Sequence, residues 1–596
     1  MGDQETGTLT ALYAEWLVWA LPLLAIPFVP LLSRWHRVRD WFAAGIVGVS
    51  FLLAVSLLLD VQGGEIIESS IPWLSAYGFT VTAHVDGLAA FLAVVVNSLG
   101  FLIVVYSQGY MAHESGLPRY YSLVLLFIGA MTGLVVAGNF LQLYVFWEIV
   151  GICSAFLIAF WYDKPEAVRA GLKAFLVTRV GDAALLIGLV WLYANTGSVD
   201  FQKLGSLASQ GIIPTSLLTT TGVLVLIGAM GKSAQVPLHV WLPDAMEGPT
   251  TVSALIHAAT MVNAGVYLVA RTYPIFSSSS TWLTTVGWVG IASALLAASV
   301  ATVTMDIKRV LAYSTISQLG LMFAALGTGT QGGWFASQFH LMSQGFFKAL
   351  AFLAAGSIIH TLGTRNMGEM GGLRKRMPLT FIAFLFSTLA LSGVPPFVGF
   401  WSKDLIITEL SLAKMNVQVW LVFAVSVLSS FYMFRALFKV FFGPESKTAR
   451  EKNLHEAPKI MTVPLMILSA GVLVLGFTEQ GTAGLLGLKE TLALELPLIG
   501  ASIAAILLGF VPSYYAFILG RPDPRIFLQK HPLLGSLRNT MLAGYGFDAL
   551  YAAIFVRPSS RISNIVRSIQ TGILGKNLWP MLALLLLLAL WLVTRP

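Results

Sequence analysis

The feature that most constrains how this chain folds is a series of apolar stretches, each about 20 residues long, that recur from residue 14 to residue 593. A helix of that length crosses the hydrocarbon core of a bilayer. Charged residues make up 11% of the 596 residues, against about 25% in soluble domains. The alternating segments of a membrane β-barrel are not seen in the sequence. We therefore predict an all-α, polytopic membrane protein.

The apolar stretches predict about sixteen membrane spans, whose loops differ in charge. The loops that follow odd-numbered spans hold most of the Lys and Arg residues. Because basic loops stay on the cytoplasmic side, this asymmetry predicts that both termini lie outside. It also accounts for the net charge of +8 and argues against a nucleic-acid partner. The predicted spans lie near residues 14–33, 42–60, 86–106, 120–137, 139–161, 171–194, 216–235, 250–271, 282–304, 308–327, 334–360, 379–413, 417–441, 459–478, 495–519 and 577–593.

Two spans contain proline breaks. The seventh is interrupted at "AQVPLHVWLP", just after Lys232, and the twelfth at "SGVPPFVGFWSKD", just before Lys403. Proline removes a backbone donor, and hydrocarbon tolerates the opened helix only where protein or water satisfies the freed groups. Paired breaks are typical of inverted-repeat transporters with sites near the midplane. Proline kinks alone are common, but a lysine beside each break favours transport.

Ionisable side chains recur inside the predicted spans, where each charge costs about 2.5–3.5 kcal/mol unless it is paired, hydrated or neutralised. Arg179 and Asp182 are three residues apart on one helical face, which makes them a natural local pair or simply a static one. Acids, bases and imidazoles distributed over many spans suit proton transfer. The full set is Glu148, Arg179, Asp182, Lys232, His257, His340, Lys348, Lys403 and Asp404.

Structural roles compete with transport roles for some of these residues. A lone buried histidine such as His257 is more often a satisfied core residue, and Lys348 could extend its ammonium to an interface. Glu148 and Lys232 are the strongest candidates, because each lies mid-span without a partner in its own helix turn. The adjacent pair 308–309 is interpreted as marking the cytoplasmic start of a span.

The sequence contains none of the common nucleotide-binding, metal-binding or catalytic motifs of soluble enzymes. The "GKS" at 231–233 is not a phosphate loop, because the first glycine of that motif would fall at Leu226. There is no G-x-G-x-x-G after a strand and no H-E-x-x-H motif. The single cysteine, Cys153, excludes a disulfide framework and a cysteine-based metal site. We therefore expect no cofactor or metal in this chain.

The two ends of the chain differ from the spans between them. The first twelve residues carry no Lys or Arg, so we expect the first apolar segment to be a retained span rather than a signal peptide. Residues 547–576 place isoleucines at near-helical spacing with arginines between them. This segment is too charged to span and is predicted to lie along the membrane surface or a partner.

Several motifs resemble the L subunit of respiratory complex I. They are "WEIVGICSAFLIAFWY", "KAFLVTRVGDA", "GKSAQVPLHVWLPDAMEGPTTVSALIHAATMVNAGVYLVAR", "DIKRVLAYSTISQLG", "HLMSQGFFKALAFLAAGS", "MGGLRKRMP" and "GVPPFVGFWSKD". The resemblance covers roughly residues 90–410, and "GFDALYAAIFVRP" at 546–558 is similar to the tail of that subunit. Relatives of this subunit occur in F420H2 dehydrogenases, membrane-bound hydrogenases and multi-subunit cation/proton antiporters.

The resemblance implies two inverted five-helix repeats. Its expected division of the chain is N-terminal helices at 1–119, a first repeat at 120–271, a second repeat at 282–441, further helices and basic loops at 442–540, and a C-terminal amphipathic lateral helix with a last span at 541–596.

The resemblance also implies roles for the buried ionisable residues. Glu148 would be the carboxylate partner of Lys232, the central switching lysine, and Arg179 with Asp182 would modulate Glu148. His257, His340 and Lys348 would continue a polar axis to Lys403, with Asp404 beside it at the outer end.

Two departures from the family pattern stand out. Gln344 occupies a place that often holds a second histidine, which puts a direct histidine relay in doubt. The interval from Phe547 to Leu578 allows at most about 45 Å of helix, which is short for the lateral arm.

The expected function is proton translocation driven by a complex I-like NAD(P)H-, F420H2- or ferredoxin-quinone oxidoreductase. Quinone, flavin and iron–sulfur clusters would then belong to partner subunits, and M- and N-type antiporter-like subunits would be the membrane neighbours. The expected location is the inner or plasma membrane. The alternatives are a Na⁺/proton antiporter subunit and a membrane scaffold of another complex, such as a hydrogenase or an inorganic-carbon uptake system.

Overall fold

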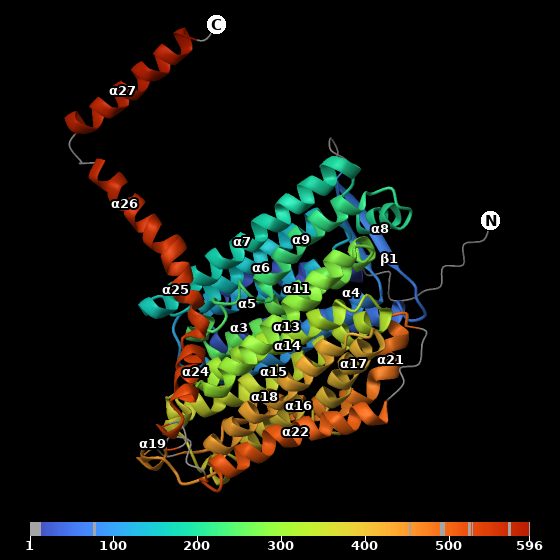
Figure 1. The fold of residues 1–596 in the computed structure, drawn as a ribbon, viewed down its shortest axis with the longest axis vertical. Helices are drawn as coiled ribbons and strands as arrows, with labels where there is room; N and C mark the ends of the chain where they lie inside the picture. The colour runs from blue at the N-terminus through green and yellow to red at the C-terminus, as the bar shows by residue number, and fades with distance from the viewer. Residues whose placement is uncertain are drawn as a thin grey trace. The chain divides into compact units, whose positions relative to one another are not determined.

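The computed structural model describes residues 13–74, 79–451, 454–488, 495–521, 526, 529–569 and 574–594. The chain forms two compact units, Met1–Pro532 and Leu533–Pro596. The first unit is a large helical bundle, in which α7 and α9 lie side by side (Figure 1).

The elements of the first unit follow one another along the chain as short and long helices around one hairpin. They are α1 (Ala14–Ala25), α2 (Phe28–Leu31), α3 (His36–Asp60), β1 (Ile67–Leu74), β2 (Phe79–Val85), α4 (Gly87–Tyr110), α5 (Leu117–Val135), α6 (Phe140–Ile158), α7 (Pro165–Thr196), α8 (Phe201–Ser209), α9 (Thr215–Lys232), η3 (Asp244–Glu247), α10 (Thr250–Ala254), η4 (Leu255–Ala259), α11 (Met261–Arg271), α12 (Tyr273–Phe276), α13 (Ser280–Val303), α14 (Ile307–Leu326), α15 (Gln331–Leu362), η5 (Met367–Glu369), η6 (Leu373–Lys375), α16 (Pro378–Ser392), α17 (Val398–Leu412), α18 (Asn416–Phe441), α19 (Lys447–Glu451), α20 (Lys459–Val474), η7 (Leu475–Thr478), α21 (Glu479–Leu485) and α22 (Leu496–Phe517).

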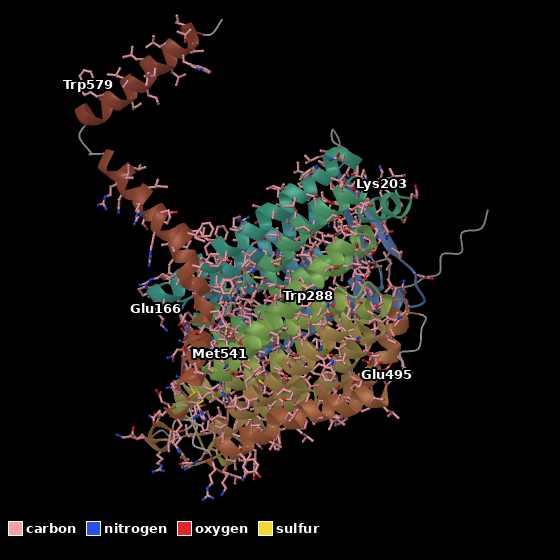
Figure 2. All side chains as sticks on the ribbon, viewed as in Figure 1. Glu166, Lys203, Trp288, Glu495, Met541 and Trp579 are labelled. Atoms are coloured by element: carbon pink, nitrogen blue, oxygen red, sulfur yellow. The ribbon has the colours of Figure 1, made fainter. Side chains whose placement is uncertain are left out.

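Within the described residues, 13 helices are long and apolar enough to cross a membrane, and three shorter apolar helices accompany them. The prediction of a polytopic helical membrane protein is therefore confirmed, while the count of sixteen spans stays a prediction. We call the end of the bundle that carries the predicted basic loops the basic face. Figure 2 marks the two ends of α7, with Glu166 in its first turn at the basic face and Lys203 on α8 beyond its other end.

One hairpin departs from the all-α expectation. β1 pairs antiparallel with β2, with Ile67 opposite Val85. β2 also joins the bundle through its backbone, because the His84 N–H donates to the carbonyl of Val136 at 2.8 Å. The cause is local, since residues 79–85 ("FTVTAHV") alternate apolar and polar side chains and bury the end nearest α4.

A partly buried ion pair fixes this hairpin end to the bundle. Arg271, at the end of α11, donates to both oxygens of Asp86 at 2.6 and 2.8 Å, and to the hydroxyl of Tyr267. Asp86 also caps α4 by accepting from the Ala89 N–H. Burial opposes ionisation of Asp86, but attraction to Arg271 and these hydrogen bonds outweigh it, so the pKa of the Asp86 carboxyl lies well below its usual value.

Replacing Arg271 by Met is expected to destabilise the protein by about 3 kcal/mol, because it leaves the Asp86 carboxylate without its cation. The stabilisation from this pair is present above about pH 4 and is lost as the pH falls through the lowered pKa of Asp86. Thermal unfolding of the detergent-solubilised protein measures both effects. Lys447→Ala is the control, because Lys447 pairs with Glu451 only on the exposed surface. Equal unfolding temperatures for the Arg271 and Lys447 variants would contradict a stabilising role of the Arg271–Asp86 ion pair.

Both predicted proline breaks are present. α9 ends at Lys232, and the chain then runs through turns to η3 instead of continuing as an α-helix. α16 ends at Ser392 and α17 begins at Val398, so Lys403 lies in the second turn of α17. Each break therefore leaves a lysine close to the opened backbone, as the sequence predicted.

Side chains satisfy backbone groups that the first break frees. Ser293 accepts a hydrogen bond from the Val236 N–H at 2.9 Å, and the Trp241 indole donates to the carbonyl of Gly231 at 3.0 Å. The break is thus held by side chains from inside the bundle, as irregular backbone at membrane depth requires.

The second unit begins at the second residue of α24 (Pro532–Leu542) and continues through η8 (Gly544–Gly546), α25 (Phe547–Tyr551), η9 (Ala552–Val556), α26 (Arg557–Ile569) and α27 (Leu574–Val593). From Phe547 to Ile569 these elements form one unbroken helical run, which agrees with the predicted amphipathic helix. Residues 570–573, which end the predicted segment, lie outside the described residues. Its placement along a membrane or partner stays a prediction.

Candidate functional site: a buried ion pair and a polar axis

Lys232 is completely buried at the end of α9. Its ammonium donates to Oδ2 of Asp182 on α7 at 3.2 Å and lies 5.7 Å from the ring centre of Trp147 on α6. Gly151, one turn after Trp147, makes room for it, since a Cβ at that position would collide with the ammonium. Three helices therefore hold this charge in place.

Asp182 is the acceptor at the centre of this arrangement. Its Oδ1 accepts the indole N–H of Trp147 at 2.6 Å, while its Oδ2 accepts from Lys232. A buried carboxylate is stable when it is paired with a cation and its oxygens accept hydrogen bonds. The carboxylate thus joins α6, α7 and α9 at one point.

This pairing differs from the one expected from the sequence. Lys232 contacts Asp182 instead of Glu148, and Arg179 pairs with Glu148 on α6 instead of Asp182. Arg179 and Asp182 are three residues apart but face different ways, since the side chain of Arg179 is 37% exposed and that of Asp182 is 1% exposed. The expected local pair and the expected Glu148–Lys232 contact were therefore wrong for this structure.

His257 lies in η4, a wide π-helical turn between α10 and α11. It is buried, its Nδ1 is 3.0 Å from the hydroxyl of Thr315 on α14, and its ring packs against Phe352 on α15. The described residues provide no hydrogen-bond partner for its Nε2. One nitrogen is thus left for a proton or a bridging water.

Lys348 and His340 both project from α15 into the protein interior. The Lys348 ammonium donates to Ser314 on α14, and Nδ1 of His340 is 2.9 Å from the hydroxyl of Ser402 on α17. Gln344 lies between them on the same helix and is completely buried. α15 therefore carries the polar axis from α14 towards α17.

Lys403 ends the axis beside the second break. Its ammonium donates to the carbonyl of Leu391 at 2.5 Å and to Ser429 at 3.3 Å, both neutral acceptors. Its neighbour Asp404 is buried and accepts from Ser502 through Oδ1. Lys403 and Asp404 therefore point to different partners and do not form an ion pair with each other.

Buried polar atoms without a protein partner accompany this axis. Each such atom would cost about 1–3 kcal/mol in a dry interior. A bridging water molecule bound at these atoms would remove that cost. Water can then connect titratable groups that do not touch. Among the described residues these atoms include His257 Nε2, His340 Nε2, Gln338 Oε1, Asp404 Oδ2 and both side-chain polar atoms of Gln318 and Gln344.

Comparison with known proteins identifies the family of this chain. Residues 137–476 match the family described as NADH:quinone oxidoreductase/Mrp antiporter, transmembrane region, and residues 73–121 match the complex I chain 5 N-terminus. The chain belongs to the NADH:quinone oxidoreductase/Mrp antiporter family. NAD(P)H-quinone oxidoreductase chain 5 of Synechocystis is 38% identical over 93% of this chain and 91% of its own length. The chloroplast subunit 5 of Zygnema circumcarinatum is 36% identical, over 90% and 89%.

Two solved structures of membrane complexes contain chains with this fold. A chain of the Mrp complex from Dietzia has a TM-score of 0.80 at 27% identity, and the match covers 98% of this chain but 63% of the longer Mrp chain. A chain of the archaeal membrane-bound sulfane sulfur reductase has a TM-score of 0.79 at 22% identity, which shows the fold alone.

Sequence reasoning missed two residues of this antiporter-family site. The Trp147 indole donates a hydrogen bond to Asp182 and so fixes the orientation of that carboxylate. In the sequence, only its position beside Glu148 in "FWEIV" pointed to Trp147. Lys308, interpreted as a helix start, is buried, and its ammonium donates to the carbonyls of Met246 and Gly248 at 2.7 Å each. It therefore fastens α14 to the segment that follows the first break.

Metal ligation has no support in the described part of the chain, where no group of three His, Cys, Asp or Glu side chains is arranged to hold an ion. The buried ionisable side chains described above form a series of proton donors and acceptors.

Proposed function

We propose that this chain is a proton-translocating membrane subunit of a complex I-like NAD(P)H-, F420H2- or ferredoxin-quinone oxidoreductase. The observation that carries the proposal is the buried Lys232–Asp182 ion pair at the break of α9. In a buried pair of this kind, the proton affinity of the lysine depends on its distance from the carboxylate. When the carboxylate moves away, the charged form of the lysine is disfavoured and the lysine releases its proton. The family names of the relatives support the assignment.

The proposed route uses the residues described above. Lys232 takes up a proton while Asp182 is close, and releases it towards His257 when the ion pair opens. Lys348 and His340 pass it along α15, and Lys403 with Asp404 delivers it to the far face. Glu148 and Arg179 act from outside this line as a second ion pair, whose rearrangement would alter the field at Asp182.

The same family membership supports the proposed setting. Electron transfer occurs in partner subunits that hold flavin, iron–sulfur clusters and quinone, and M- and N-type subunits are the membrane neighbours. The protein lies in the inner or plasma membrane with both termini outside, as the basic loops indicate. One broken span falls within each proposed inverted repeat, 120–271 and 282–441, and this supports the proposed division of the chain.

A second candidate is a subunit of a monovalent cation/proton antiporter without a redox partner. The Mrp complex structure, at 27% identity, favours it.

Inverted membrane vesicles that contain the whole complex separate the two functions. We expect NAD(P)H or another electron donor, with quinone, to drive proton uptake that an uncoupler abolishes and that does not require Na⁺. Purification through a tag on this chain should also recover redox subunits. Na⁺-dependent proton movement without any donor, together with copurification of antiporter subunits alone, would overturn the proposal in favour of the second candidate.

A further inference from the structure

The β1–β2 hairpin lies at the end of the bundle opposite the basic face, and one histidine of β2 is enclosed there. α3 begins in the basic segment 33–40 and ends at Asp60, so the chain has crossed the bundle before it enters β1. Figure 1 shows β1 near α8, at the other end of the bundle from α19. The histidine is His84, which is 3% exposed. It takes no part in the polar axis described above.

Two carboxylates flank the His84 imidazole. Its Nδ1 is 2.9 Å from Oε2 of Glu68, the residue directly opposite it on β1. Its Nε2 is 3.8 Å from Oδ2 of Asp86, the residue that caps α4. Protonation places a positive charge between these two acids, so the charged ring attracts β1 and the start of α4 at the same time.

A third element encloses the ring. The side-chain amide of Gln202, in the first turn of α8, lies 3.3 Å from His84 Nε2. An amide has both a donor and an acceptor, so Gln202 can form a hydrogen bond with the ring in either protonation state. Gly138, which follows α5, allows the close approach, because a Cβ there would lie 3.2 Å from the Cβ of His84. The hairpin, α4 and α8 therefore meet at one imidazole.

The neighbouring elements bring further charges to this region. Arg271 on α11 binds both carboxylate oxygens of Asp86 and opposes a positive charge on the ring. Glu15 on α1 accepts a hydrogen bond from Ser69 on β1 at 3.1 Å. Lys203 on α8 is exposed, and water screens its charge. Acidic groups on α1, β1 and α4 therefore outnumber the buried cation.

These surroundings determine when the imidazole is charged. Burial opposes protonation of His84 and is the largest single influence. The hydrogen bonds with Asp86 and Glu68 outweigh burial and the repulsion from Arg271, and they raise the pKa of the imidazole above its usual value. The stabilisation from a charged His84 is thus fully present below about pH 6.5, the pKa of an unperturbed histidine. It is lost as the pH rises through the raised pKa.

We infer that His84 is a pH-sensitive latch, which holds β1 more firmly to the bundle when the compartment at this face becomes acidic. In the charged state, Nδ1–H donates a charge-assisted hydrogen bond to Glu68, and Nε2 carries a second proton that faces Asp86. In the neutral state the second proton is absent. β1 is then retained by its pairing with β2 and by the hydrogen bond from the Trp16 indole to Ser69 at 2.8 Å. The latch requires no electron transfer and so goes beyond the proposed function.

Amide hydrogen–deuterium exchange of the assembled complex tests the latch. Wild type is compared with His84→Gln at each pH, so that the pH dependence of intrinsic exchange cancels. At about pH 6 we expect the amides of residues 67–74 to exchange about threefold faster in the variant, which is the effect of one half-exposed ion pair. By about pH 9, where the ring is neutral, most of this difference should be gone. His360→Gln is the matched control, because it removes an exposed imidazole near the end of α15.

A second variant tests the latch if loss of the imidazole disturbs folding. Glu68→Gln keeps His84 and replaces a side chain that is 50% exposed. It is expected to remove the pH-dependent part of the protection of β1. A ratio of exchange rates between His84→Gln and wild type that stays constant from about pH 6 to about pH 9 would overturn the latch. A wild-type pH response in Glu68→Gln would overturn it as well. Either result leaves the proposed function intact, because the measurement does not involve proton translocation.

Discussion

Replacing Lys232 by Ala is expected to reduce redox-driven proton translocation about 100-fold or more, because the variant has no group at this position that can change its protonation state. Proton uptake by inverted vesicles, normalised to the amount of assembled complex, measures the effect. Lys203→Ala is the control, because Lys203 is exposed on α8 at the end of the bundle (Figure 2). Wild-type translocation by the Lys232 variant would remove this residue from the mechanism.

A folding defect must be separated from a transport defect in this experiment. Lys232→Ala alone leaves a buried carboxylate without its cation, which costs about 3–5 kcal/mol. Removing both partners, Lys232→Ala with Asp182→Ala, avoids the unpaired charge and is expected to recover much of the lost stability. The double variant should therefore assemble better than the single variant and still fail to translocate protons.

The second large effect concerns which carboxylate is the partner of Lys232. A double-mutant cycle between Lys232 and Asp182, using Ala at both positions, is expected to give a coupling free energy of about 2 kcal/mol or more, because the two side chains are in direct contact. The same cycle between Lys232 and Glu148 is expected to give a smaller coupling, since Glu148 pairs with Arg179. Unfolding free energies of the purified variants supply both values.

The cycle between Arg179 and Glu148 is the matched reference. This ion pair is more exposed than Lys232–Asp182, and a solvated or rim pair contributes less than a buried one. A larger coupling of Lys232 with Glu148 than with Asp182 would mean that the expected family pairing dominates in the folded protein and would contradict the arrangement described here.

Much of the fold was predictable because its causes are local in the sequence. Helices that cross a membrane need long apolar runs, and proline opens a helix at its own position, so the breaks after Lys232 and before Lys403 were visible in advance. The hairpin at 67–85 was missed because it is a short element between two spans, and its stability depends on backbone bonds to a loop far along the chain, at Val136.

The candidate site was predictable in its members but not in its pairing. Burial cost identifies which charges must have a function or a partner, but spacing does not say which way a side chain turns. Arg179 and Asp182 share a helix, yet Asp182 turns inward because the indole of Trp147 and the ammonium of Lys232 both require an acceptor there. Such a choice depends on three helices at once, and a single sequence does not contain that information.

Gly151 has a consequence for how the protein can vary. It has no charge, no polar side chain and no proton to exchange, yet the Lys232 ammonium occupies the volume that a methyl group would fill. Exchange for alanine would push the ammonium aside and change its distance to Asp182, although every ionisable residue stayed the same. The size of the side chain at position 151 therefore affects the strength of the Lys232–Asp182 ion pair. A substitution at this neutral position on α6 can weaken or abolish transport.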